Sequence, residues 1–420
     1  MTFRKLLAAA SSAVMITAIA LGLDTNSSAT DKYEVIYSFN GMEGGVGPLG
    51  LISDAAGNLY GTTQSTFTNG GVVFKLSHDA SGRWSETVLH TFQGMANPAS
   101  GLVFDKARNL YGTTQNGGTY GGGTVFKLTP EPDGKWSETV LHTFQGKNGA
   151  NPNGELVIDR AGNLYGTTAS GGGHNLGLVF KLAPNTNGEW IETVLHDFQG
   201  TDGATPSAGL IFDSAGNLYG TTYFGGAHNN GTVFKLTPEP NGEWTETVLH
   251  SFQGPPDGAN PYAGLIFDRV GNLYGTTTGG GVASFLGFGT VFKLAPEPNG
   301  EWTETVLHIF QATGNPPNPG PGGSAPYARL TFDRAGNLYG TAADGGSVGS
   351  AGVVFKLSPE ANGRWIESVL HDFKGPPTDG AGPMGALIID AAGNLYGTTV
   401  SGGSGACGAW SCGAVFQIRP

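Results

Sequence analysis

The chain has 420 residues, of which 72 are Gly and 24 are Pro, while 13% are charged and 10% are aromatic. Aromatic residues at regular intervals among glycines are typical of many short strands joined by turns, and they exclude a wholly disordered chain. The formal net charge of −12 argues against nucleic acid and anionic membrane surfaces as partners.

The first 29 residues have the organisation of a secretory signal peptide. Arg4 and Lys5 precede an apolar run over residues 6–23, and Ser27-Ser28-Ala29 provides a small-residue cleavage site. A membrane-anchoring helix is the alternative, because this run reaches the lower length limit for a span. We expect cleavage, no membrane span in the remaining chain, and a secreted or periplasmic protein.

The dominant feature of the remaining chain is a repeat that contains Leu-Tyr-Gly-Thr, at intervals of 51 to 65 residues. Its tyrosines are Tyr60, Tyr111, Tyr165, Tyr219, Tyr274, Tyr339 and Tyr396. Turn residues divide each repeat into four short segments, which in residues 209–253 are GLIFD, NLYGTT, GTVFKL and WTETVLHSF. Four such strands cannot bury two apolar faces alone, so successive units must pack face to face. We predict an all-β, seven-bladed β-propeller that takes residues 30–420 as a single domain.

The two ends of the repeat array indicate how the ring closes. The last repeat stops after its third strand, GAVFQI, whereas residues 33–41, YEVIYSFNG, match a fourth strand such as ETVLHTFQG at residues 86–94. The N-terminal strand is therefore predicted to pair within the C-terminal blade. A ring closed within one chain leads us to expect a monomer.

The order GLIFD, GNLYGTT, GTVFKL and ETVLHxF resembles NHL-type propeller blades and, more specifically, the Gloeobacter/Verrucomicrobia-type (GloVer) repeat. The resemblance covers residues 31–420. It implies a secreted or surface-attached bacterial propeller protein, with no established activity and no catalytic residues to transfer. Members of the family often end in a sorting or anchor segment, and this sequence departs from that pattern at Arg419-Pro420, which leaves surface attachment open.

Cys407 and Cys412 frame the sequence CGAWSC. Two cysteines this near each other usually pair in an oxidising compartment. A redox pair and half of a metal site are the alternatives, but the spacing is not CxxC and the chain has no other cysteine. We predict a structural disulfide between Cys407 and Cys412.

Two sets of titratable residues recur once per repeat and are predicted to be structural. The first strands end in Asp54, Asp105, Asp159, Asp213, Asp268, Asp333 and Asp390. Their place before a tight hairpin favours turn capping over a ring of metal ligands. The fourth strands contain His90, His142, His196, His250, His308 and His371, with Tyr37 in the matching place. These lie on the outermost strands, so we expect blade packing and not a metal site.

The loops that vary between repeats are the predicted binding surface, because function is commonly carried on loops. They join strands two and three of a blade, or consecutive blades with an insertion at residues 312–328, and both sets emerge on one face of the disc. The candidate ligand-binding residues on these loops are Tyr120, His174, Tyr223, Phe224, His228, Tyr262, Phe285, Tyr327 and Trp410. Exposed rings among glycine and asparagine suit a sugar or peptide. The alternative is that these rings plug the face of the disc.

Cofactor and catalytic signals are sparse. Asp202-Gly203, Asp257-Gly258 and Asp379-Gly380 are candidates for Ca²⁺ binding and equally for turn formation, and no other cofactor is indicated. No nucleophile elbow, HExxH or phosphate-loop sequence is present. We therefore favour a noncatalytic module that binds a glycan, a peptide or a cell-surface partner. The alternative is a propeller enzyme of lyase, glycosidase or lactonase type with a metal-assisted site at the channel mouth.

Overall fold

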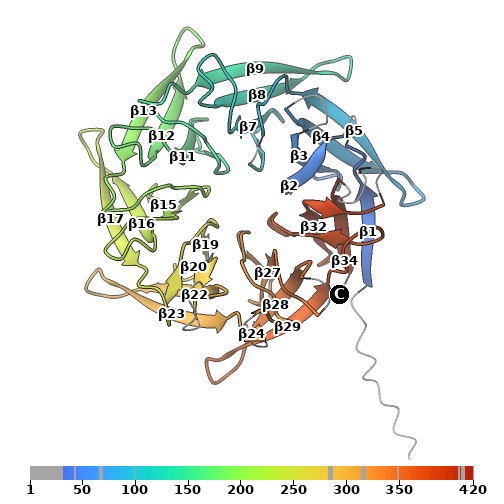
Figure 1. The fold of residues 1–420 in the computed structure, drawn as a ribbon. Coiled ribbons are helices and arrows are strands. Elements are labelled where there is room, and N and C mark those ends of the chain that lie inside the picture. The colour runs from blue at the N-terminus through green and yellow to red at the C-terminus, as the bar shows by residue number, and fades with distance from the viewer. Residues whose placement is uncertain are drawn as a thin grey trace, which may run out of the picture.

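The computed structural model describes residues 32–41, 44–65, 70–98, 100–281, 287–313, 318–347, 350–404, 407 and 412–419. This part of the chain consists of strands and turns, and no helix in it is long and apolar enough to cross a membrane. The predicted signal peptide, residues 1–29, lies outside the described residues. Seven four-stranded antiparallel sheets surround a central channel, which confirms the seven-bladed propeller (Figure 1).

Each blade contains an inner, a second, a third and an outer strand, numbered from the channel outward. The inner strands are β2 (Val46–Ser53), β6 (Val103–Phe104), β10 (Val157–Ile158), β14 (Ile211–Phe212), β19 (Ile266–Phe267), β26 (Thr331–Phe332) and β31 (Ile388–Ile389). The second strands are β3 (Leu59–Ser65), β7 (Leu110–Thr114), β11 (Leu164–Thr168), β15 (Leu218–Thr222), β20 (Leu273–Thr277), β27 (Leu338–Ala342) and β32 (Leu395–Thr399). The third strands are β4 (Val72–His78), β8 (Thr124–Pro130), β12 (Leu178–Pro184), β16 (Thr232–Pro238), β22 (Thr290–Pro296), β28 (Val353–Pro359) and β34 (Ala414–Arg419). The outer strands are β5 (Trp84–Thr91), β9 (Trp136–Thr143), β13 (Trp190–Asp197), β17 (Trp244–Ser251), β23 (Trp302–Ile309), β29 (Trp365–Asp372) and β1 (Lys32–Ser38).

The hairpin between the inner and second strands is built by the recurring aspartate. In the fourth blade, Asp213 Oδ1 accepts hydrogen bonds from the backbone N–H groups of Ala215 and Asn217, each at 2.9 Å. Its Oδ2 accepts from Asn217 Nδ2 at 2.6 Å and from the Tyr219 hydroxyl at 3.1 Å. Burial alone would raise the pKa of Asp213, but the hydrogen bonds from Asn217, Tyr219 and Ala215 together outweigh it and hold the pKa below its ordinary value. The predicted capping role is confirmed.

The blades are held together by pairs of buried phenylalanines. At each of the seven junctions, the Phe that follows an outer strand packs edge-to-face on the third-strand Phe of the next blade, with ring centroids 4.9 to 5.3 Å apart. In the fourth blade, Phe234 also fills the space beside Gly220 of the Leu-Tyr-Gly-Thr repeat. A Cβ on Gly220 would lie 2.6 Å from Phe234 Cζ, so this position needs glycine.

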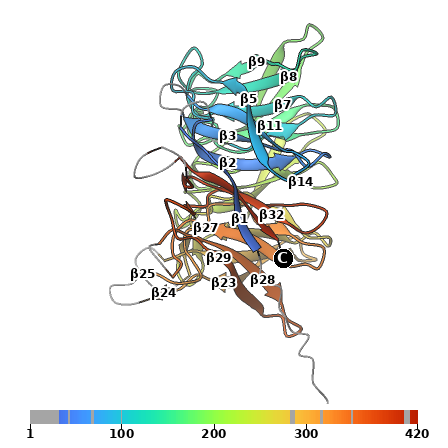
Figure 2. The same ribbon diagram turned by 90° about the vertical axis from the view of Figure 1, so that its right-hand side faces the viewer.

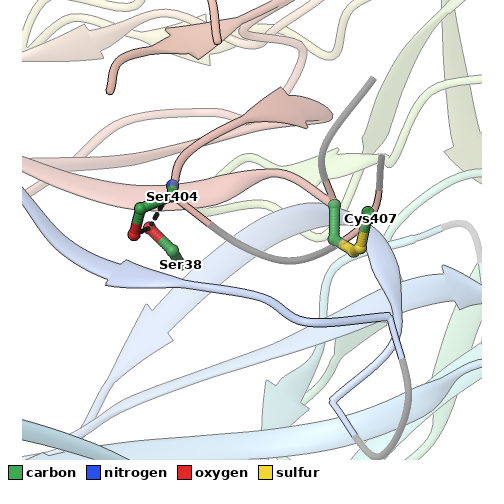
Figure 3. The surroundings of a disulfide bond; sticks show 4 residues. Ser38, Ser404 and Cys407 are labelled. Carbon is green, nitrogen blue, oxygen red and sulfur yellow. Dashed lines mark hydrogen bonds between the residues drawn. A yellow bond between two sulfur atoms is a disulfide. The ribbon is translucent and has the colours of Figure 1, made fainter. Parts of the chain in front are cut away.

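The N-terminal strand closes the ring as predicted. β1 pairs antiparallel with β34, from Lys32 opposite Arg419 to Ser38 opposite Ala414, and Figure 1 shows β1 beside β34 at the outer rim. Ser38 Oγ also accepts a hydrogen bond from the Ser404 N–H at 3.1 Å, beside the Cys407–Cys412 disulfide (Figure 3). The predicted disulfide is therefore present next to the closure.

Six of the seven inner strands are shorter than the GLIFD segments suggested and are paired over two residues only. At six junctions, a threonine hydroxyl of the second strand donates to a carbonyl in the segment that leads into the inner strand of the next blade, at 2.9 to 3.4 Å. These donors are Thr62, Thr113, Thr167, Thr221, Thr276 and Thr341. At these junctions the inner edge of a blade is therefore tied to its neighbour and not only to its own sheet.

The described residues also form three two-stranded ribbons, which are separate from the seven blade sheets. They pair β18 (Gly258–Ala259) with β21 (Gly279–Gly280), β24 (Ala312–Thr313) with β25 (Asn318–Pro319), and β30 (Gly380–Ala381) with β33 (Ser401–Gly402). Two of them join a loop between blades to a loop between strands two and three, so both loop sets lie on the same face, as predicted. Seen edge-on in Figure 2, the ring is a flat disc, and the β24–β25 ribbon lies at the left-hand side.

Candidate functional site

The inner strands enclose an open cavity with a volume of about 670 Å³ at the channel. A proline precedes six of the inner strands and lies within β2 in the first blade, and residues at two positions after this proline line the cavity. The mouth tier, directly after the proline, consists of Leu49, Asn153, Ser207, Tyr262, Tyr327 and Met384. The inner tier, directly before the buried leucine of the strand, consists of Gly50, Gly101, Glu155, Gly209, Gly264, Arg329 and Ala386. A volume in this range suits a small ligand.

Four aromatic side chains from three consecutive blades form one cluster at the mouth, here called the aromatic cluster. Tyr223 contacts Phe224 with ring centroids 4.5 Å apart and contacts Tyr262 at 5.9 Å, and Tyr262 contacts Tyr327 at 5.3 Å. The rings of each pair stand nearly perpendicular, which is a favourable aromatic geometry. Tyr262 and Tyr327 line the cavity, and 42% of the Phe224 surface is exposed. The cluster therefore forms part of the cavity wall and part of the disc surface.

Hydrogen bonds among three loops hold the aromatic cluster in place. The Tyr223 N–H donates to the Thr205 carbonyl at 3.1 Å, and Asn260 Nδ2 donates to the Tyr223 carbonyl at 3.0 Å. Asn260 has a φ of 59°, in the left-handed region that asparagine tolerates better than most residues. Burial and the nearby Tyr223 raise the pKa of the Tyr262 phenol, so its hydroxyl keeps its proton at neutral pH.

Amide side chains line another part of the mouth. Gln64, Asn97, Gln115 and Asn153 come from the first three blades and line the cavity. Asn97 Nδ2 donates to Gln115 Oε1 at 2.6 Å, which fixes both amides. The mouth is therefore asymmetric, with aromatic rings on the fourth to sixth blades and amides on the first three.

Two opposite charges meet inside the channel. Arg329 Nη2 lies 3.4 Å from Glu155 Oε2, although their strands belong to the sixth and third blades. The Glu155 carboxylate lies over Gly101, where a Cβ would overlap it, so the glycine is needed for this arrangement. Among the described residues that line the cavity, these two side chains carry the charge.

The structure brings together four of the nine predicted ligand-binding residues. Tyr223, Phe224, Tyr262 and Tyr327 form the aromatic cluster. Tyr120, His174 and His228 are exposed on the loops of the second, third and fourth blades, with no contact to this cluster among the described ring pairs. Phe285 and Trp410 lie outside the described residues.

Glu155, Arg329 and the amides were missed by the sequence analysis. A signal for the first two was present, since they interrupt a position that is Gly or Ala in the other five blades.

The recurring histidines contact carboxylates at the rim, which belong to the next blade in three cases and to the loop after the same strand in the other three. Each His Nε2 lies 2.9 to 3.6 Å from a carboxylate oxygen. The pairs are His90–Glu138, His142–Glu192, His196–Asp202, His250–Asp257, His308–Glu367 and His371–Asp379. The Tyr37 hydroxyl donates to Glu86 at 2.7 Å in the equivalent place. The predicted packing role of these residues is confirmed.

The aspartates proposed as Ca²⁺ ligands take part in these contacts and in turns. Asp202 accepts the Gln199 N–H at 2.9 Å, and Asp257 accepts the Gln253 N–H at 2.9 Å. The turn-forming alternative is therefore seen directly, while Ca²⁺ binding stays a prediction. Within the described ranges, no group of three or more His, Cys, Asp or Glu side chains is arranged to hold a metal ion.

Comparisons with known structures identify the same architecture. The extracellular domain of a putative one-component system from B. thetaiotaomicron is 14% identical, with a TM-score of 0.54, and the match covers 92% of this chain and 42% of that one. PorZ, a surface component of the type-IX secretion system of Porphyromonas gingivalis, is 14% identical with a TM-score of 0.50, and the match covers 91% and 48%. This chain spans less than half the length of either protein, and likeness at this identity shows the fold alone.

The family comparison is more specific. No curated protein matches the chain. The resemblance to NHL-type blades stays a prediction. The model of the Gloeobacter/Verrucomicrobia repeat matches residues 23–211, 132–322 and 188–416, which together span nearly the whole sequence. The chain therefore belongs to the Gloeobacter/Verrucomicrobia repeat family.

Proposed function

We propose that this protein is an extracytoplasmic, noncatalytic module that binds a glycan at the mouth of its channel. The observation that carries this proposal is the aromatic cluster beside an open cavity whose other wall carries amides. Sugar rings present apolar C–H faces and hydroxyl edges, so they need both a ring to pack on and amides to hydrogen-bond. A peptide or surface partner is the broader alternative.

The extracytoplasmic location is supported by three independent features. The N-terminal sequence has the pattern of a signal peptide. The Cys407–Cys412 disulfide suits an oxidising compartment. The two structural neighbours described above are named as an extracellular domain and a surface component.

The test is a binding screen of the secreted chain against neutral and acidic oligosaccharides and cell-wall fragments, followed by calorimetry on any hit. Tyr262→Ala and Tyr327→Ala are each expected to weaken glycan binding roughly ten-fold, because each removes a ring from the cavity wall. Tyr120→Ala is the matched control, since Tyr120 is 62% exposed and outside the aromatic cluster. A glycan that binds equally well to all three variants would contradict the proposed site, and binding of peptides alone would replace the glycan proposal.

A further inference from the structure

The inner tier departs from the symmetry of the ring at two positions. Five of its seven members are Gly or Ala, and the other two are Glu155 and Arg329, in contact with each other across the channel. The small residues at five positions of the inner tier leave the channel open. The opposite charges of Glu155 and Arg329 in that open space are not explained by the repeat.

The charge pair is weak as a structural element. Its atoms are 3.4 Å apart, and the side chains are 42% and 37% exposed for Arg329 and Glu155. Ion pairs at this exposure contribute little to stability, because solvent screens them and both side chains lose freedom. The blades are already held by phenylalanine pairs, threonine bonds and histidine–carboxylate contacts. Arg329 and Glu155 can therefore each bind another group without a loss of stability of the ring.

Arg329 lines the same cavity as two rings of the aromatic cluster. Tyr327 and Arg329 are two residues apart in the segment that leads into β26, on either side of a bend at Ala328. Tyr262 of the neighbouring blade contacts Tyr327 with ring centroids 5.3 Å apart. A sugar ring held by these tyrosines would therefore place its substituents in the cavity that Arg329 also lines.

We propose, resting on the glycan-binding function above, that the ligand carries a carboxylate and that Arg329 binds this carboxylate in place of Glu155. The structure already has a carboxylate at this position, that of Glu155, so the guanidinium is placed to receive a group of the same chemistry. Glu155 then acts as an internal competitor that holds Arg329 in position when the channel is empty. The ligand class is an acidic oligosaccharide that contains uronic acid.

Long-range attraction does not contribute to this recognition. The chain has a net charge of −12, which repels an anionic ligand at a distance. Specificity must therefore come from the local contact at Arg329, and removal of that one side chain should abolish the preference for the acid.

The experiment measures calorimetric affinities for trimers of galacturonic, glucuronic and mannuronic acid, each beside its methyl ester, and for a sulfated galactose trimer. The ester keeps the sugar skeleton and removes the charge. We expect at least one acid to bind ten-fold or more tightly than its ester. Arg329→Gln should remove this difference, a loss of about ten- to hundred-fold for the acid. Glu155→Gln should tighten binding of the acid by up to about five-fold, because the competitor is lost.

A matched control is available where β1 pairs with β34 and closes the ring. Arg419 lies 3.3 Å from Glu34, and both side chains are about as exposed as the channel pair. Arg419→Gln should leave the affinities for acid and ester unchanged.

The outcomes separate the two proposals. Esters that bind as tightly as their acids, or an Arg329→Gln variant with unchanged preference, overturn the inference while the glycan module stands. Tighter binding of the sulfated trimer than of any uronate overturns the choice of carboxylate. If no acid binds but a neutral glycan does, the inference again fails alone. If neither acidic nor neutral glycans bind anywhere in the full screen, both proposals fail.

Discussion

The rim and the channel of this propeller are built from the same repeat, but they keep its symmetry to different degrees. At the rim, every junction has the phenylalanine pair and a histidine or tyrosine that contacts a carboxylate. In the channel, the mouth tier runs from Met and Leu to Ser, Asn and Tyr, and the inner tier includes one acid and one base. The repeated contacts hold the ring together, whereas the unrepeated ones are free to specify a ligand.

The largest effect on stability is expected when one of the repeated phenylalanine contacts between blades is removed. Phe234→Ala deletes a fully buried ring that packs edge-to-face on Phe198, with centroids 5.2 Å apart. We expect the free energy of unfolding to fall by about 3 to 5 kcal/mol, measured by denaturant titration, because a cavity is left between two blades. Phe224→Ala, at an exposed ring of the same blade, is the control and should cost about 1 kcal/mol or less. Equal losses in the two variants would remove the distinction between the two regions.

A smaller effect is expected from the glutamates at the rim junctions. Burial, followed by the nearby Asp257, raises the pKa of Glu304 from 4.5 to about 7, and burial with Asp202 raises that of Glu246 to about 7. A carboxyl group whose pKa is higher in the folded state than in the unfolded chain stabilises the fold when protonated. Its contribution is complete below pH 4.5 and is lost as the pH rises through about 7. The free energy of unfolding should therefore fall between pH 5 and pH 8, by on the order of 1 kcal/mol per glutamate after solvent screening.

This pH dependence has a direct control. Glu304→Gln mimics the protonated side chain, so it should remove the share of Glu304 from the fall between pH 5 and pH 8 and leave that of Glu246, without changing the acid side of the curve. Glu301→Gln, at an exposed hairpin of the same blade, should leave the curve unchanged. A stability that stays constant or rises from pH 5 to pH 8 would show that these glutamates are already ionised in the folded protein.

The repeated framework of hairpins and blade contacts could be predicted from the sequence because its residues recur. Seven copies of Asp, Tyr and Phe at fixed spacing define the hairpins and the blade contacts, and the match between residues 33–41 and 86–94 predicts the closure. The aromatic cluster could be predicted in part, since loop position alone does not say which rings approach each other. Tyr223 and Tyr262 come from different blades, and their loops are joined by the bond from Asn260 to the Tyr223 carbonyl.

The charge pair in the channel was not predicted from the sequence. Glu155 and Arg329 are 174 residues apart, and no local pattern connects them. Alignment of the repeats places them at the same position of two blades, but their contact requires the ring to be closed and its channel to be narrow. We expected the functional differences between repeats to lie in the loops. The structure shows that the repeats also differ on the inner edge of the blades, at Glu155 and Arg329.

The smallest expected effect is the loss of stability on removal of that pair. Arg329→Gln leaves the glutamate partly exposed to solvent, and a pair at this exposure contributes between about 0 and 1 kcal/mol to the free energy of unfolding. Denaturant titration of Arg329→Gln and of Arg419→Gln should therefore give small and similar changes, although only Arg329 lies in the cavity. A loss of 3 kcal/mol or more in Arg329→Gln alone would mean that the channel pair is a structural tie between the third and sixth blades. In that case the channel would belong with the rim as part of the scaffold, and the contrast between the two regions would not hold.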